Sequence, residues 1–365
     1  MDMRRPPVQH LCFLRPIALL LVMSIGPSAA FAQSSGTVEW FSGGRTLTAS
    51  LLIRQPGYLM ALGRDGRLHE FEGSSADGVR TVPRKFEPIT RTQMRRSLQS
   101  EYGFQFEVLL TNNFLVVQPR GRGRRWPDLF QHAHDAFTHY MDVRGVRTSN
   151  GNFPMVAIVM PDAIGMRNEF RRMEIDAGRV AGIYHPFSNR VVTHDGGHAG
   201  HFMETIRHEA AHQSGYNIGV HSRINDMPRW IVEGVGQMFE PEAMSDRGRA
   251  SDLSDQINRD ALMTLRDRYP EPKRFLSDLV QLVRHDKLFD GDHQRIAEAY
   301  AMAWGTMFYL GQQQPRRFAQ LLDRTSRRQP FVAYDPDTRL RDLESIVGTS
   351  IDRFGMRIFR YIEQL

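Results

Sequence analysis

The hydrophobic periodicity changes along the chain, and this change constrains the fold more than any other feature. Between residues 33 and 120, short β-prone segments such as TVEWF and TLTASLLI are separated by glycine-containing turn signals. One of these, Asp65-Gly66, is typical of a type I′ hairpin turn. From Pro228 the pattern becomes helical and predicts helices over residues 228–240, 255–268, 274–285, 294–312, 315–325 and 340–364. We therefore expect an α+β protein in which strands precede helices.

The first 32 residues have the pattern of a secretory signal peptide. Three arginines (Arg4, Arg5 and Arg15) precede or flank a short apolar run, IALLLVMSI, and the segment ends in Ala-Phe-Ala. This order of charge, apolar run and small residues predicts cleavage near the Ala32–Gln33 bond. The apolar run is shorter than the ~20 residues that a membrane-spanning helix needs. We expect a periplasmic or secreted protein with no stable membrane anchor after cleavage.

The cysteine count and the charge limit the chemistry that the exported chain can carry. Cys12 is the only cysteine and lies in the signal segment, so a metal ion would have to be held by His, Asp or Glu. That segment carries three Arg and one Asp, so its removal lowers the formal charge from +6 to +4. The one basic cluster, residues 118–127, lacks interleaved aromatic residues, and we expect no nucleic-acid partner. Its Gly/Arg-rich part predicts a boundary between a small β-rich domain, residues 33–120, and a second domain, residues 121–365.

Residues 205–217, TIRHEAAHQSGYN, contain the strongest chemical motif. His208 and His212 are four residues apart, which places them on one face of a helix about 5–6 Å apart. Two imidazoles at this spacing can bind one zinc ion, and Glu209 lies beside them where a general base for a zinc-activated water would be needed. Because the pattern fixes only three residues, it also occurs by chance on amphipathic helices. A third ligand at a suitable distance would favour the metal site.

Glu233 is the candidate third ligand. It lies in the segment NDMPRWIVEGVGQMFEPEA, where Pro228 favours the start of a helix. The neighbouring side chains are apolar, and a buried unpaired carboxylate is costly unless a metal ion compensates it. Gly234 and Gly236 would allow this helix to approach the His208 helix closely. The alternative is a surface glutamate.

These motifs together resemble the gluzincin zinc metallopeptidases. HEAAH followed by PRWIVEGVGQMFE is most similar to peptidase-MA-like bacterial proteins of largely unassigned function. The resemblance implies a mainly helical, thermolysin-like catalytic domain with a small sheet and a Zn²⁺ ion bound by His208, His212 and Glu233. It also implies that Glu209 is the general base. The segment AGIYHPFSNRVVTHD resembles the edge strand of the family's active site.

The resemblance implies further roles that are less well defined. AEAYAMAWGTMFYLGQ resembles a later helix of the family, so Tyr300 is the candidate that stabilises the oxyanion, with Tyr309 and His293 as runners-up. Gln237 occupies a position where many relatives carry an acid. Another group, such as Asp226, is then expected to orient the ligands.

Three alternatives to an active gluzincin stay open at this point. A metzincin-like site would use His221 in place of Glu233, because HEAAHQSG shares that group's glycine, although Ile218 occupies the usual third-histidine position. A catalytically silent zinc-binding relative would act as an envelope binding module. A structural protein would bind no metal. If the protein is an enzyme, we expect a peptide or protein substrate; the sequence indicates neither its cleavage specificity nor its oligomeric state.

Overall fold

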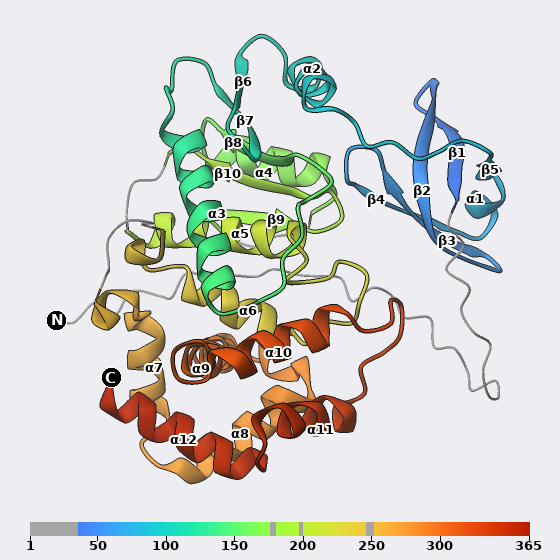
Figure 1. Ribbon diagram of the computed structural model, residues 1–365. Helices are drawn as coiled ribbons and strands as arrows, with labels where there is room; N and C mark the ends of the chain where they lie inside the picture. Colours follow the sequence, from blue (N-terminus) through green and yellow to red (C-terminus); the bar gives the residue numbers. More distant parts are fainter. Residues whose placement is uncertain (1–35, 176–179, 197–199, 246–251) are drawn as a thin grey trace.

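The computed structural model describes residues 36–175, 180–196, 200–245 and 252–365 (Figure 1). The predicted signal peptide and its cleavage site lie outside these residues. The described chain has two sheets followed by a mainly helical part, which confirms the α+β fold class. Among the described residues, no helix combines the length and the apolar character needed to cross a membrane.

The first sheet is an antiparallel unit with the strand order β4-β3-β2-β1-β5. Its strands are β1 (Thr37–Ser42), β2 (Arg45–Gln55), β3 (Tyr58–Gly63), β4 (Leu68–Glu72) and β5 (Arg80–Val82), with the short helix α1 (Ser74–Asp77) before β5. The predicted turn at Asp65-Gly66 does connect β3 to β4, but only Gly66 has a positive φ, of 84°. A type I′ turn needs two such residues, so the predicted turn type is wrong.

The second sheet has the strand order β6-β7-β8-β10-β9. Its strands are β6 (Phe106–Leu110), β7 (Phe114–Pro119), β8 (Met155–Met160), β9 (Gly182–His185) and β10 (Arg190–His194). Strands β7, β8 and β10 are parallel, whereas β6 and β9 pair antiparallel at the two edges. Because β7 pairs with β8, the boundary expected at residue 120 falls inside this sheet. The Gly/Arg-rich stretch is the turn into a crossover helix, not a linker between domains.

Helices cover both faces of the second sheet. Helices α2 (Arg91–Tyr102) and α4 (Ala163–Arg172) pack on one face through Met94, Leu98, Met166 and Phe170. Helices α3 (Arg125–Val143) and α5 (Gly200–Asn217) pack on the other face, where Phe130 of α3 and Ile206 of α5 join one apolar cluster. This layering fixes the position of α5, which carries the HEAAH motif.

The remaining helices form a second core around α9 (Figure 1). They are α6 (Arg229–Met238), α7 (Arg259–Arg268), α8 (Pro272–Arg284), α9 (His293–Gln313), α10 (Pro315–Ser326), α11 (Pro336–Val347) and α12 (Ile351–Gln364), with short 3₁₀ turns η1 (Glu242–Ser245), η2 (Leu253–Gln256) and η3 (Asp286–Asp290). The single helix expected over residues 340–364 is wrong. Gly348 adopts a left-handed conformation, with φ of 65°, and ends α11 before α12 begins.

The first sheet is attached to the hairpin formed by β9 and β10. The backbone N–H of Leu68 donates to the carbonyl of Phe187 at 2.7 Å. The Arg223 guanidinium donates to the carbonyls of Gly66 at 2.7 Å and Pro186 at 3.1 Å. The turn at Gly66 therefore lies against the connection between β9 and β10.

Candidate metal centre

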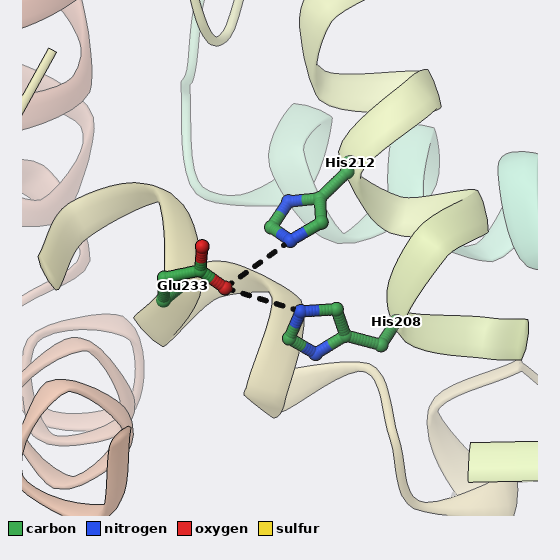
Figure 2. Close-up of side chains that lie close together, drawn as sticks. All are labelled: His208, His212 and Glu233. Atoms are coloured by element: carbon green, nitrogen blue, oxygen red, sulfur yellow. Dashed lines mark hydrogen bonds and ion pairs between the residues drawn. The ribbon is translucent and has the colours of Figure 1, made fainter. Parts of the chain in front are cut away.

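Helix α5 presents its two faces to different parts of the molecule. Ile206 and Ala210 are fully buried against the second sheet, and Phe202 packs beside them. His208 and His212 lie on the side of α5 that faces α6 (Figure 2). These apolar residues therefore form a stripe on the side of α5 opposite the histidines. It explains why both imidazoles point away from the sheet and toward Glu233.

The structure brings together the three predicted ligands, His208, His212 and Glu233. Their ligand atoms all lie within 4.8 Å of one another. Glu233 Oε2 lies 3.3 Å from His208 Nε2 and 3.4 Å from His212 Nε2 (Figure 2). All three side chains are at most 2% exposed. Among the described residues, neither ring nitrogen of His212 has a hydrogen-bond partner. This buried group could bind a metal ion, because a cation would compensate the carboxylate and accept the lone pair of an imidazole that makes no hydrogen bond.

Gly236 allows α6 to reach the two imidazoles. A Cβ atom at this position would lie 2.6 Å from His208 Cε1 and 2.9 Å from His212 Cε1. Gly234 plays the corresponding part on the other side of α6, since its Cβ would lie 2.5 Å from the carbonyl oxygen of Ala303 in α9. The two glycines therefore let α6 fit between α5 and α9. The close approach to the His208 helix that the sequence predicted for both glycines is made at Gly236, whereas Gly234 faces α9. This position of α6 brings Glu233 to the histidines.

Electrostatics in the cluster favour a positive charge next to Glu233. Burial lowers the pKa of His208, but hydrogen bonds to Glu233 and Glu240 outweigh it and raise that pKa to about 10. Burial acts to raise the pKa of Glu233, but the two histidines hold it well below its ordinary value. Without a cation, the His208 proton offsets the buried carboxylate. A divalent cation would take over this role and displace the proton.

Glu240 is a residue of the centre that the sequence reasoning missed. Its Oε1 accepts hydrogen bonds from His208 Nδ1 at 2.9 Å and from Gln237 Nε2 at 2.8 Å. Asp226, the group expected to orient the ligands, lies elsewhere: it accepts from the backbone N–H of Tyr334 at 2.7 Å and pairs with Arg339 at 3.2 Å. No local pattern in the sequence marks Glu240, because it follows the end of α6 at Met238.

The side chain of Glu209 extends from α5 to the edge strand β9. Its Oε2 accepts a hydrogen bond of 2.7 Å from the backbone N–H of Tyr184, and the side chain is 2% exposed. Burial raises the pKa of Glu209, although the neighbouring His208 and His212 and the Tyr184 N–H act in the opposite direction. A carboxylate with a raised pKa is suited to accepting and returning a proton near neutral pH.

Tyr300 lies in the helical core, on α9. Its ring packs edge-on against Phe289, with ring centroids 5.2 Å apart. Phe289 lies under the guanidinium of Arg229 at 4.7 Å, and Arg229 Nε lies 3.9 Å from Glu233 Oε1. Tyr300 is thus connected to Glu233 through Phe289 and Arg229, and its proposed part in stabilising an oxyanion stays a prediction.

Tyr309 and His293, the runners-up for the oxyanion, and His221, the alternative ligand, are not part of the candidate ligand group. Tyr309 accepts a hydrogen bond from Gln314 at 2.9 Å, and exposed His293 is the first residue of α9. His221 is buried beside Gly215 and contacts the Tyr216 ring at 5.3 Å. Within the described residues, the group that could hold a metal ion contains Glu233 and not His221. The geometry therefore favours a ligand set that contains Glu233 over one that contains His221.

Comparison with known proteins gives one family match. Residues 202–332 are similar to a family described as "Protein of unknown function (DUF1570)". The matched segment contains all three ligands of the candidate metal centre, and also Glu209 and Glu240. No curated protein matches the chain.

Proposed function

We propose that this protein is an exported zinc-dependent peptidase of the gluzincin type. The observation that carries the proposal is the convergence of the ligand atoms of His208, His212 and Glu233 to within 4.8 Å. Glu209 lies on α5, the helix that carries the two histidines. Zinc prefers imidazole and carboxylate ligands, and a catalytic zinc site commonly has three protein ligands and one open position. Two histidines and a glutamate match this donor set. The resemblance of HEAAH and the downstream WIVEG segment to gluzincins supports the same assignment.

In this proposal each residue has a separate task. His208, His212 and Glu233 would hold the zinc ion. When bound, zinc polarises a peptide carbonyl and acidifies water. Glu209 accepts the proton of the attacking water and then passes it to the leaving amine, which its raised pKa favours. Tyr300 is the residue that would stabilise the oxyanion by a hydrogen bond.

The edge position of β9 supports a peptide or protein substrate. Strand β9 pairs with β10 on one side and forms the end of the second sheet. Its residue Tyr184 donates its backbone N–H to Glu209. An extended peptide can add to a sheet edge by main-chain hydrogen bonds, here at backbone groups other than the Tyr184 N–H, which Glu209 occupies. A substrate bound there would lie close to the general base.

A second candidate function is a catalytically silent zinc-binding protein that acts as an envelope binding module. The observation that favours it is burial: His208, Glu209, His212 and Glu233 are all at most 2% exposed. Cleavage of a polypeptide requires that its carbonyl reach the metal ion. A buried centre needs no such access if the metal ion serves only to stabilise the fold.

A peptide-library digest separates the two functions. The wild-type protein and Glu209→Gln are each loaded with zinc, and the zinc content of both is measured. The peptidase proposal predicts equal zinc and a loss of cleavage of about 10²–10⁴-fold in Glu209→Gln. Tyr300→Phe should retain zinc and cleave more slowly. Equal zinc in both proteins with no cleavage by the wild type would contradict the peptidase and support the binding module.

A further inference from the structure

Glu240 stands at the end of α6 with both carboxylate oxygens engaged. Oε1 accepts from His208 Nδ1 and Gln237 Nε2, and Oε2 accepts from Asn258 Nδ2 at 2.7 Å. The backbone carbonyl of the same residue accepts from Arg207 Nε at 2.6 Å. The side chain is largely buried, since Glu240 is 7% exposed. The carboxylate is therefore held by His208, which is a candidate metal ligand, and by two amides, those of Gln237 and Asn258.

The chemistry of this contact fixes the tautomer of His208. A carboxylate only accepts hydrogen bonds, so the proton between the two groups belongs to His208 Nδ1. Nε2 can then keep its lone pair for a cation on the side of Glu233, whose Oε2 lies 3.3 Å away. Imidazole ligands in proteins commonly depend on such a partner for orientation and basicity. Gln237 supports Glu240, because its Nε2 donates to Glu240 Oε1 at 2.8 Å.

Asn258 gives the network a fixed direction. It is the N-cap of α7, and its Oδ1 accepts from the backbone N–H of Ala261 at 3.1 Å. The amide oxygen is therefore committed to α7, and the NH₂ group points to Glu240 and to Gln237 Oε1, at 2.7 and 2.9 Å. The donors and acceptors form one consistent chain from α7 to His208. Reversal of the Asn258 amide would remove the cap of α7 and place two acceptors against each other.

We propose that Glu240, held in place by Gln237 and Asn258, is the positioning residue that orients His208 as a metal ligand. Asn258, on a helix that supplies no ligand, thereby sets the metal affinity of the centre. This inference rests on the metal-binding part of the proposed function and is independent of whether peptides are cleaved.

The test measures zinc affinity by competition with a chromophoric chelator, in four forms of the full exported chain. The forms are wild type, Glu240→Gln, Asn258→Asp and the double variant. In Glu240→Gln, Oε1 can still accept from His208, but the new amide NH₂ then meets the NH₂ of Asn258. We expect a loss of about 10–100-fold. Asn258→Asp still caps α7, but it places a second carboxylate against that of Glu240. We therefore expect a loss of zinc affinity in this variant as well.

The double variant restores the pairing. The amide introduced at position 240 can donate to the carboxylate introduced at position 258, and that carboxylate still accepts from the Ala261 N–H. The carboxylate at position 258 can no longer donate to Gln237 Oε1, as Asn258 Nδ2 does at 2.9 Å. We therefore expect the double variant to recover part of the affinity lost by Glu240→Gln. Absorption of the Co²⁺-loaded proteins gives a second measurement: its d–d bands should change in Glu240→Gln and return toward wild type in the double variant. A merely structural role for Glu240 would lower the stability of the metal-free protein without this recovery.

A second variant covers the case in which Glu240→Gln does not fold. Asn258→Ser keeps an N-cap for α7 but is too short to reach Glu240, and it should also lower zinc affinity. The matched control is Asp335→Ser, at the N-cap of α11, where Asp335 accepts from Thr338 N–H at 2.9 Å. It should leave zinc affinity unchanged.

The outcomes are distinct. Wild-type affinity in Glu240→Gln or in Asn258→Ser, or a double variant no better than Glu240→Gln, overturns the inference and leaves the metal centre standing. A wild-type protein that binds no zinc overturns both.

Discussion

Replacement of Gly236 by alanine should disable the metal centre while α6 still forms. The added Cβ would lie 2.6 Å from His208 Cε1, 2.8 Å from His208 Nε2 and 2.9 Å from His212 Cε1. Ordinary contacts begin at 3.4 Å, so the rings or the helix must move by about 0.8 Å. Zinc–ligand distances tolerate only about 0.2 Å. His208 cannot yield freely because Glu240 holds its other nitrogen.

The size of the effect follows from these distances. We expect zinc affinity to fall by at least about 100-fold, since the displacement exceeds the tolerance of the metal bonds several times. Stability of the metal-free protein should change less. Overpacking costs about 1–3 kcal/mol, and alanine regains about 1 kcal/mol of helix propensity over glycine. The net loss of unfolding free energy should therefore be about 0–2 kcal/mol.

The assay combines chelator competition with urea unfolding of the metal-free protein. Gly165→Ala, in α4, is the matched control, because its Cβ would meet its neighbours at 3.5 Å or more. It should bind zinc as the wild type does and be equally or slightly more stable. Zinc affinity of Gly236→Ala within threefold of wild type would refute the reasoning that α6 rests directly on the two imidazoles.

Four further predictions concern pH, a helix end and the contact between the sheets. Zinc affinity should rise by about tenfold per pH unit between pH 6 and 8, because His208, with a pKa of about 10, must lose its proton to bind; an affinity independent of pH would contradict this. Because its pKa is raised, the charge of His208 should stabilise the metal-free protein, and this contribution is complete below pH ~6.5. The contribution should be lost as the pH rises through about 10. Urea unfolding at several pH values measures this change in the free energy of unfolding. Gly348→Ala should lower the unfolding free energy by about 1 kcal/mol, since φ there is 65°; unchanged urea unfolding would count against it. Arg223→Ala removes two hydrogen bonds to backbone carbonyls. It should weaken hydrogen-exchange protection in the turn at Gly66 by about 1–3 kcal/mol. Unaltered exchange would show that other contacts hold the two sheets together.

The candidate ligands could be predicted because their geometry is local. The spacing of His208 and His212 fixes their common face once the segment is helical. Glu233 was recognisable as a carboxylate inside an apolar helix, where burial requires a partner. Glu240 could not be found in this way. Its contacts depend on where α6 ends and on how α7 brings Asn258 back to the centre, which no local periodicity encodes.

The sheet boundary shows the same limit at a larger scale. Residues 106–119 look like a continuation of the β-rich start of the chain. Their strand β7 nevertheless pairs in parallel with β8, across the crossover helix α3. Parallel pairing joins segments that are distant in sequence, so turn signals and composition cannot indicate it. The break at Gly348 was locally encoded, but the apolar pattern continues on both sides of it and predicts one helix.

Elemental analysis of the purified protein, after dialysis at neutral pH, tests the central claim most directly. The claim is that two imidazoles of α5 and one carboxylate of α6 bind a single zinc ion. The account predicts one zinc per wild-type chain and a large loss of zinc in His212→Ala and in Glu233→Ala. A wild-type protein without zinc, or a Glu233→Ala protein with as much zinc as wild type, would contradict it.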